Sequence, residues 1–269
     1  TRMIRRIFFP GLLFAVLGSL LFTTRCSNDE PAPQQIFTND SLIFFGSHDY
    51  NLYAPSGKNG LVKWTAATGK EISSSPILAN GIVYVGSNDK YMYAFDALTG
   101  ALKWKTTTGD LVVSSPFVEG NVVYAGSYDG FVYAWNATTG AEMWKTPTAG
   151  KVASSPTIVG TTLYIGSADG YLYALDPSNG GLRWKGLVQG VIDTSSPAVA
   201  SGVVYVGNSA GSMFAFDATT GALKWQSSVS GGFNSSPTVP GPLVIVGSND
   251  KPVYGLNITT GAVAWKYET

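Results

Sequence analysis

The chain contains the segment Ala94-Phe95-Asp96-Ala97-Leu98-Thr99-Gly100-Ala101-Leu102-Lys103-Trp104, and related segments return about every 40 residues. Its tryptophan recurs as Trp64, Trp104, Trp144, Trp184, Trp225 and Trp265. A glycine that ends a Tyr-Val-Gly-Ser-like stretch keeps the same step from Gly46 to Gly247. A Ser-Ser-Pro triplet occurs five times with the same spacing, ending at positions from Pro76 to Pro237. Three markers in register indicate six repeats of about 40 residues.

One repeat reads as four short strands separated by tight turns. In the second repeat the expected strands cover residues 74–79, 82–87, 91–96 and 101–108. They are rich in β-branched and aromatic residues and are divided by turn residues such as Asn80-Gly81. A single four-stranded antiparallel sheet cannot bury two aromatic faces, so successive sheets should pack face to face around an axis. The sequence therefore predicts an all-β protein, a β-propeller of four-stranded antiparallel blades.

The first repeat differs from the others at its start. It has no Ser-Ser-Pro triplet before residues 41–45, so its innermost strand should be short or missing. We predict that residues 36–269 form a six-bladed ring closed by residues 35–38. An open arc, or an arc closed by dimerisation, is the alternative.

The quoted segment resembles the tryptophan-docking motif of the quinoprotein (PQQ-type) propeller family. The shared pattern is Ala, any residue, Asp, two free positions, Thr-Gly, three free positions and Trp. It is kept in full at Ala215, Asp217, Thr220, Gly221 and Trp225, and the other repeats carry small changes. The resemblance implies that each tryptophan docks between adjacent blades and that all six periodic tryptophans are structural. A large amphipathic indole suits that position, because it buries area while its N–H finds a partner.

The N-terminus reads as an export signal. Arg5-Arg6 precede an apolar run over residues 7–22, which is short for a membrane-spanning helix. Residues 1–26 are therefore expected to be a signal peptide, and Cys26 resembles the lipid-attachment site of bacterial lipoproteins. Residues 27–35 would form a tether. An uncleaved signal anchor and an unmodified thiol are the alternatives. We expect a protein exported to the bacterial cell envelope and anchored at the outer membrane, on its periplasmic or surface side.

Composition excludes several classes of function. Without the four arginines in the first 25 residues, 13 Lys and Arg stand against 17 Asp and Glu, which does not suit nucleic-acid binding. One cysteine and one histidine, His48, leave almost nothing for disulfides, zinc sites or Ser-His catalysis. The resemblance implies that enzymes of the quinoprotein family hold a quinone, a calcium ion and a disulfide between adjacent cysteines. This chain has no pair of cysteines. We predict no catalytic, cofactor-binding or metal-binding residues and no enzymatic activity, with a PQQ-dependent dehydrogenase relative as a remote alternative.

Aspartates recur in the turns between the second and third strands, as Asp49, Asp89, Asp129, Asp169 and Asp250. A ring of carboxylates could bind cations. Tight hairpins, however, require Asp-Gly pairs, so we favour the interpretation that these aspartates are turn residues rather than ligands. His48 lies in the first of these turns and is expected to be solvated. Trp135, outside the period, is expected in the core rather than in a stacking platform for a sugar or quinone.

The connections between the fourth strand of one repeat and the first strand of the next vary most. Because a rigid scaffold carries recognition on its loops, they form the candidate binding face. Its residues are Lys70, Asp110, Lys151, Gln189, Asp193 and Asn234. They should share a face with the Asp-bearing turns and surround the mouth of the axial channel.

The sequence thus predicts a non-enzymatic envelope lipoprotein that acts as a protein-interaction scaffold. In fold and anchor it resembles the propeller lipoprotein of the outer-membrane barrel-assembly machinery, which implies envelope proteins as partners and a role in outer-membrane protein assembly. A sensor that binds a carbohydrate or another small ligand at the channel mouth is the alternative. A scaffold should show an exposed apolar patch or an open strand edge, whereas a ligand binder should show a deep mouth with convergent polar groups.

Overall fold

The computed structural model describes residues 41–229 and 231–269. The expected signal peptide, the tether and the ring-closing residues 35–38 lie outside them. Within the described ranges every regular element is a β-strand, and the strands form six antiparallel sheets. The all-β propeller class is confirmed.

The sheets follow one another along the chain, and we call them blades 1 to 6. Blade 1 contains β1 (Phe45–Gly46), β2 (Asn51–Pro55) and β3 (Val62–Ala67), and blade 2 contains β4 (Ile77–Ala79), β5 (Ile82–Gly86), β6 (Tyr91–Asp96) and β7 (Leu102–Thr107). Blade 3 contains β8 (Phe117–Glu119), β9 (Val122–Gly126), β10 (Phe131–Asn136) and β11 (Glu142–Pro147). Blade 4 contains β12 (Thr157–Val159), β13 (Thr162–Gly166), β14 (Tyr171–Leu175) and β15 (Leu182–Leu187). Blade 5 contains β16 (Ala198–Ala200), β17 (Val203–Gly207), β18 (Ser212–Asp217) and β19 (Leu223–Ser228), and blade 6 contains β20 (Leu243–Gly247), β21 (Val253–Asn257) and β22 (Val263–Tyr267).

Blades 2 to 5 have the four strands that the sequence predicts, and blades 1 and 6 have three. Blade 1 was expected to be short of its innermost strand, but blade 6 was not. In blade 6 the innermost strand is reduced to an isolated bridge between Thr238 and Ile245. Pro240 stands where blades 2 and 5 have Ala79 and Ala200, and proline has no N–H with which to extend the pairing.

Five apolar clusters join consecutive blades. Between blades 2 and 3, for example, Tyr84 and Trp104 pack with Val123 and Trp135, all of them buried. The core is therefore divided among the blade interfaces, as expected for sheets that pack face to face.

The periodic glycines allow this close packing. A Cβ at Gly86, which ends β5, would lie 2.5 Å from a side-chain atom of Val112 in the loop between β7 and β8. Gly126 stands in the same relation to Val152, at 2.3 Å. Only glycine lets the strand end and the next loop approach so closely.

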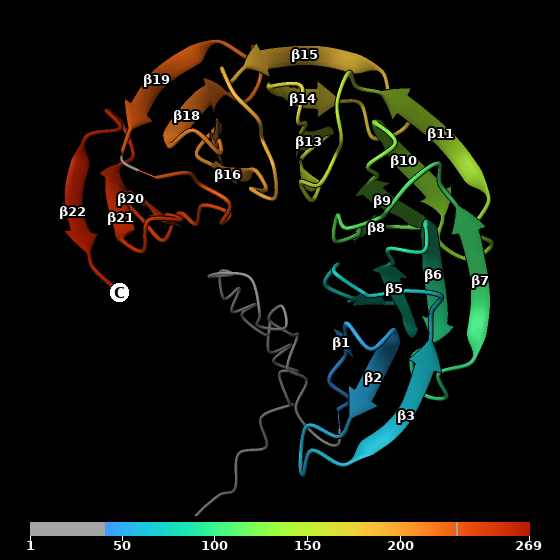
Figure 1. The fold of residues 1–269 in the computed structure, drawn as a ribbon. Coiled ribbons are helices and arrows are strands. Elements are labelled where there is room, and N and C mark those ends of the chain that lie inside the picture. The colour runs from blue at the N-terminus through green and yellow to red at the C-terminus, as the bar shows by residue number, and fades with distance from the viewer. Residues whose placement is uncertain (1–40, 230) are drawn as a thin grey trace, which may run out of the picture.

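The six blades lie along an open arc, with the outermost strands β3, β7, β11, β15, β19 and β22 on its rim (Figure 1). Blades 1 and 6 flank an opening, and the C-terminus lies beside it. The ring closed at six blades is therefore not what the described residues form, and they follow the open-arc alternative. The angle between packed sheets sets the curvature of the arc, and repeat count alone does not determine that angle.

Candidate functional site

Five of the periodic tryptophans bond to the following blade. The Nε1 of Trp104 donates to the carbonyl oxygen of Ala137 at 2.8 Å, and the hydroxyl of Tyr84 donates to the same oxygen at 3.1 Å. The equivalent tryptophan bonds run from Trp64 to Ala97, from Trp144 to Pro177, from Trp184 to Ala218 and from Trp225 to Ile258. Within the described residues Trp265 makes no such bond and is 38% exposed. Docking on a following blade is therefore seen for five of the six tryptophans, and for Trp265 it stays a prediction.

The two serines of each Ser-Ser-Pro triplet have separate roles. In blade 2 the buried Ser74 accepts the N–H of Gly86 at 2.9 Å, which ties the innermost segment to β5. The N–H of Ser75 donates to the hydroxyl of Ser115, one repeat further on, at 2.8 Å. The same link joins Ser115 to Ser155, Ser155 to Ser196 and Ser196 to Ser236. A serine ladder therefore runs from blade to blade along the innermost segments.

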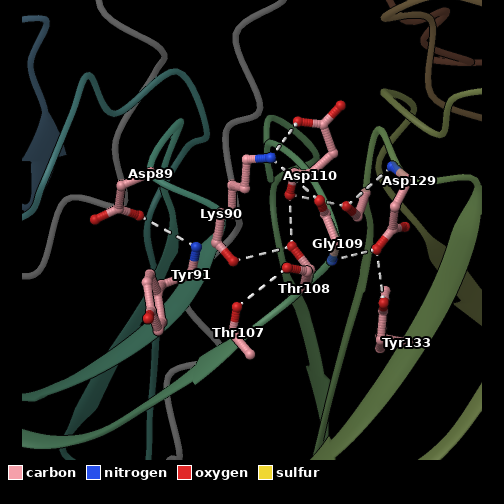
Figure 2. A network of polar contacts seen from close by, with 10 residues as sticks. Asp89, Lys90, Tyr91, Thr107, Thr108, Gly109, Asp110, Asp129 and Tyr133 are labelled. Atoms are coloured by element: carbon pink, nitrogen blue, oxygen red, sulfur yellow. Dashed lines mark hydrogen bonds and ion pairs between the residues drawn. The ribbon is translucent and has the colours of Figure 1, made fainter.

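The turn aspartates lock neighbouring blades together. Asp129 accepts hydrogen bonds from the hydroxyl of Tyr133 at 2.7 Å and from the N–H of Gly109, at the end of the preceding blade, at 2.6 Å (Figure 2). Asp89 and Asp169 bond in the same way to Tyr93 and Tyr173 and to the N–H groups of Gly69 and Ala149. Their carboxylates are thus engaged in the fold. The tyrosines that hold them were not identified from the sequence.

Two residues of the candidate binding face meet the turn that follows the second strand of a neighbouring repeat. Asp110 forms an ion pair with Lys90, with its carboxylate 3.4 Å from the Lys90 Nζ (Figure 2). Lys151 places its Nζ 4.7 Å from the centre of the Tyr128 ring, within range of a cation–π interaction. The variable loops and the Asp-bearing turns therefore lie on the same edge of the sheets.

Tyr128 is the centre of this group. Burial raises the pKa of the half-buried Tyr128, and the carboxylates of Asp193 and Asp110 raise it further. The Lys151 amine therefore lies over the Tyr128 ring, and the charges of Asp110 and Asp193 act on the Tyr128 hydroxyl. We call these three predicted face residues together with Tyr128 the Tyr128 cluster. Sequence reasoning missed Tyr128. The available signal was that other repeats carry His48, Asn88, Ala168, Ser209 or Asn249 at this position, so the only large aromatic ring is in blade 3.

The remaining predicted face residues lie on the same kind of loop: Lys70 between blades 1 and 2, Gln189 on the loop of Asp193, and Asn234 between blades 5 and 6. The side chains are exposed at Lys70, Gln189 and Asn234. The backbone of each residue takes part in the structure of its loop. The carbonyl oxygens of Lys70 and Asn234 accept hydroxyl hydrogen bonds from Thr68 and Thr194 at 2.7 Å each. Gln189 has a positive φ of 48°.

A cavity of about 540 Å³ lies away from the Tyr128 cluster, between blades 1 and 2. Its lining includes Ala66 of β3, Phe95 of β6 and Lys105 of β7. Across residues 41–229 and 231–269, no group of three or more His, Cys, Asp or Glu side chains is placed to hold a metal ion. His48 is exposed in its turn, and Trp135 is fully buried with its ring stacked on Tyr133 at 5.0 Å.

A family model described as "Beta-alanine-activating enzyme, beta-propeller" matches residues 24–269. The chain belongs to this β-propeller family. Among solved structures, this member of the family is similar to BamB from Moraxella catarrhalis, with a TM-score of 0.75 and 23% identity over 89% of this chain and 78% of BamB. It is also similar to the computationally designed Ika8 protein, with a TM-score of 0.73 and 20% identity over 90% of this chain and 75% of Ika8.

These likenesses confirm the β-propeller fold, which the chain shares with BamB. The comparison with curated proteins found no match. Among the described residues of this β-propeller family member, no helix has the length and apolar character needed to cross a membrane.

Proposed function

We propose that this protein is a non-enzymatic scaffold that holds protein partners in the bacterial cell envelope. The Tyr128 cluster is the observation that carries the proposal. It combines a half-buried aromatic ring, a lysine amine at 4.7 Å and two carboxylates. Protein interfaces are typically anchored by residues of this kind, with an aromatic ring at the centre and polar groups around it.

The rigidity of the surrounding blades supports this role. The Tyr128 N–H donates to the carbonyl oxygen of Leu111, and the Lys151 carbonyl oxygen accepts the N–H of Ala168, so both loops are fixed by neighbouring blades. A partner that docks on fixed loops loses less conformational entropy than one that must order them. The cavity between blades 1 and 2 lies elsewhere, so the cluster has the character of a surface for a protein rather than of a deep ligand pocket.

A more specific role, in outer-membrane protein assembly, rests on the fold and on the expected lipid anchor together. The BamB-like fold and the lipoprotein-like Cys26 favour a place at the outer membrane, with components of outer-membrane protein assembly as partners. Fold alone does not carry function, so the partner must be identified directly.

The test is an affinity pull-down of the tagged protein from its native envelope, followed by mass spectrometry. Tyr128→Ala and Lys151→Glu should each reduce recovery of the same envelope proteins several-fold. Leu98→Ser is the matched control, because Leu98 is 83% exposed on the β6–β7 turn at the opposite edge of the sheets. Equal recovery from all three variants would contradict a partner-binding role for the cluster.

A further inference from the structure

The cavity between blades 1 and 2 has the size and the walls of a small-molecule site. Its volume of about 540 Å³ lies within the range of pockets that hold drug-sized ligands. One wall is the aromatic row Tyr91, Tyr93 and Phe95, which share the face of β6 that packs toward blade 1. The Tyr93 and Phe95 rings are stacked, with their centres 5.6 Å apart. Ala66 of β3 lies in the opposite wall, so the cavity is enclosed largely by apolar surface.

The residues in this interface are smaller than their counterparts in the next one. Between blades 2 and 3, Thr106 and Trp135 stand at the repeat positions of Ala66 and Phe95. The Trp135 ring is fully buried there. Because an indole is larger than a phenyl ring and threonine is larger than alanine, the smaller pair leaves space between blades 1 and 2 that the protein fills in the following interface.

Two other interfaces close the same space in different ways. Between blades 3 and 4, the hydroxyl of Thr146 donates to the carbonyl oxygen of Gly180 at 2.7 Å and links the two blades. Between blades 4 and 5, the Phe216 ring lies so near β15 that a Cβ at Gly186 would be 2.7 Å from it. Ala66 stands at the repeat position of Thr146 and Gly186. It has no hydroxyl for the first arrangement, and it carries the Cβ that excludes the second.

Lys105 supplies a positive charge to the cavity. It lines the cavity from β7, with its Nζ 4.7 Å from the centre of the Tyr91 ring. In blade 3 the equivalent Lys145 has the carboxylate of Glu142 at 3.6 Å from its Nζ. Leu102, which also lines the cavity, stands at the position of Glu142 in blade 2. An anion bound in the cavity would therefore take the place of the carboxylate that blade 3 supplies itself.

Asp89, the other charged residue of the lining, is held by the fold. Its Oδ2 accepts the hydroxyl of Tyr93 and the N–H of Gly69, each at 2.6 Å, and its Oδ1 accepts the N–H of Tyr91 at 3.1 Å. These bonds also engage the Tyr93 hydroxyl. The lining thus offers an amine and aromatic rings rather than a set of polar groups for several ligand hydroxyls, which favours an aromatic acid over a sugar.

We propose that this cavity binds a small molecule that carries an aromatic ring and a carboxylate. The ring packs between Ala66 and the row of Tyr93 and Phe95, where aromatic pairs gain from their geometry as well as from burial. The carboxylate pairs with the Lys105 amine, and this charge-assisted bond fixes the orientation of the ligand. The site is separate from the Tyr128 cluster, so it adds a ligand to the proposed scaffold and does not depend on the scaffold's partner.

The test uses the purified protein and two probes of the same shape, 2-naphthoate and its neutral amide, 2-naphthamide. Isothermal titration calorimetry measures the affinity for each. We expect 2-naphthoate to bind at one saturable site and several-fold more tightly than 2-naphthamide, because only the acid can form an ion pair with the Lys105 amine.

Three variants locate the binding. Lys105→Met keeps an unbranched side chain without the charge, and it should reduce the affinity for 2-naphthoate to that for 2-naphthamide. Lys145→Met is the control at the same position of blade 3, and it should leave both affinities unchanged because the buried Trp135 fills the space there. Phe95→Trp copies the blade 3 residue into the cavity. It should weaken binding of both probes several-fold, with circular dichroism to show that the sheets are retained.

Any of three results would overturn the proposal. Absence of saturable 2-naphthoate binding would show that the cavity is not a site for an aromatic acid. Equal affinities for the acid and the amide would show that Lys105 does not select an anion. Equal losses in Lys105→Met and Lys145→Met would place the bound probe elsewhere. None of these results bears on the recovery of partners through the Tyr128 cluster, so the proposed scaffold function is tested separately.

Discussion

The indole N–H of Trp144 donates to the carbonyl oxygen of Pro177 at 3.0 Å and so ties blade 3 to blade 4. The Trp144 side chain is 9% exposed and packs in the cluster between these blades. The same relationship, repeated around the arc, makes each tryptophan a joint between neighbouring sheets.

Trp144→Ala should therefore lower the free energy of unfolding by about 3–5 kcal/mol, the range for truncating a buried large aromatic side chain. Trp265→Ala is the matched control and should cost about 1 kcal/mol or less, because Trp265 is exposed at the end of the arc. Denaturant unfolding of the two variants measures the difference. Similar losses from both would show that Trp144 does not act as a joint.

Asp129→Ala should destabilise the protein by roughly 1–3 kcal/mol, because it leaves the Gly109 N–H and the Tyr133 hydroxyl without their shared acceptor. Asp110→Ala is the control. It removes a carboxylate that forms a surface ion pair with Lys90, and it should cost less than about 1 kcal/mol. If thermal unfolding shows equal costs, the turn aspartates do not join the blades.

The protein should lose stability in acid because of the aspartates at the turns between the third and fourth strands of blades 2, 4 and 5. Hydrogen bonds from Lys103 and Thr99 lower the pKa of Asp96 to about 2, and similar bonds, led by those from Ser178 and Thr220, lower the pKa values of Asp176 and Asp217 to about 2. A lowered pKa in the folded state means stability that is present above about pH 4 and is lost as the pH falls through about 2.

Replacing Asp96, Asp176 and Asp217 with asparagine should make the melting temperature less steep between pH 4 and pH 2. Asparagine suits the turn, because the natural copy Asn136 accepts the N–H groups of Thr138 and Thr139 in the same way. Melting curves at several pH values measure the slope. An unchanged acid slope in the triple variant would assign the acid sensitivity to other groups.

Cys26→Ser should move the protein from the membrane pellet to the soluble fraction, since Cys26 is proposed as the lipid-attachment site. Ser27→Ala, at the adjacent position, should leave the protein in the pellet. Fractionation followed by immunoblotting measures both. If the Cys26→Ser protein still pellets, the tether is an uncleaved signal anchor or a bound partner.

Much of the fold could be predicted because the repeat markers have direct physical causes. The periodic glycine recurs because a Cβ at Gly86 would collide with Val112, and Ser-Ser-Pro recurs because Ser74 and Ser75 bond within and between blades. The openness of the arc could not be predicted. It depends on the angle at which the blades pack, which many side chains set together, and no single motif records it.

The candidate site could be predicted in part. The variability of the loops identified Lys151, which lies over the Tyr128 ring, and Asp110 and Asp193, whose charges raise the pKa of Tyr128. It missed Tyr128, because that residue lies in a turn between two regular strands and looked like part of the scaffold. Only the stacking of blades brings this turn against the loop of the next blade.

The most direct test of the scaffold function is photo-crosslinking in the living envelope, with a photoreactive amino acid at position 151 and, as control, at position 98. The proposed function predicts that position 151 yields a discrete adduct with an envelope protein, that Tyr128→Ala abolishes the adduct, and that position 98 yields none. A protein without adducts at position 151, or with the same adducts at both positions, would contradict a partner-binding role for the Tyr128 cluster.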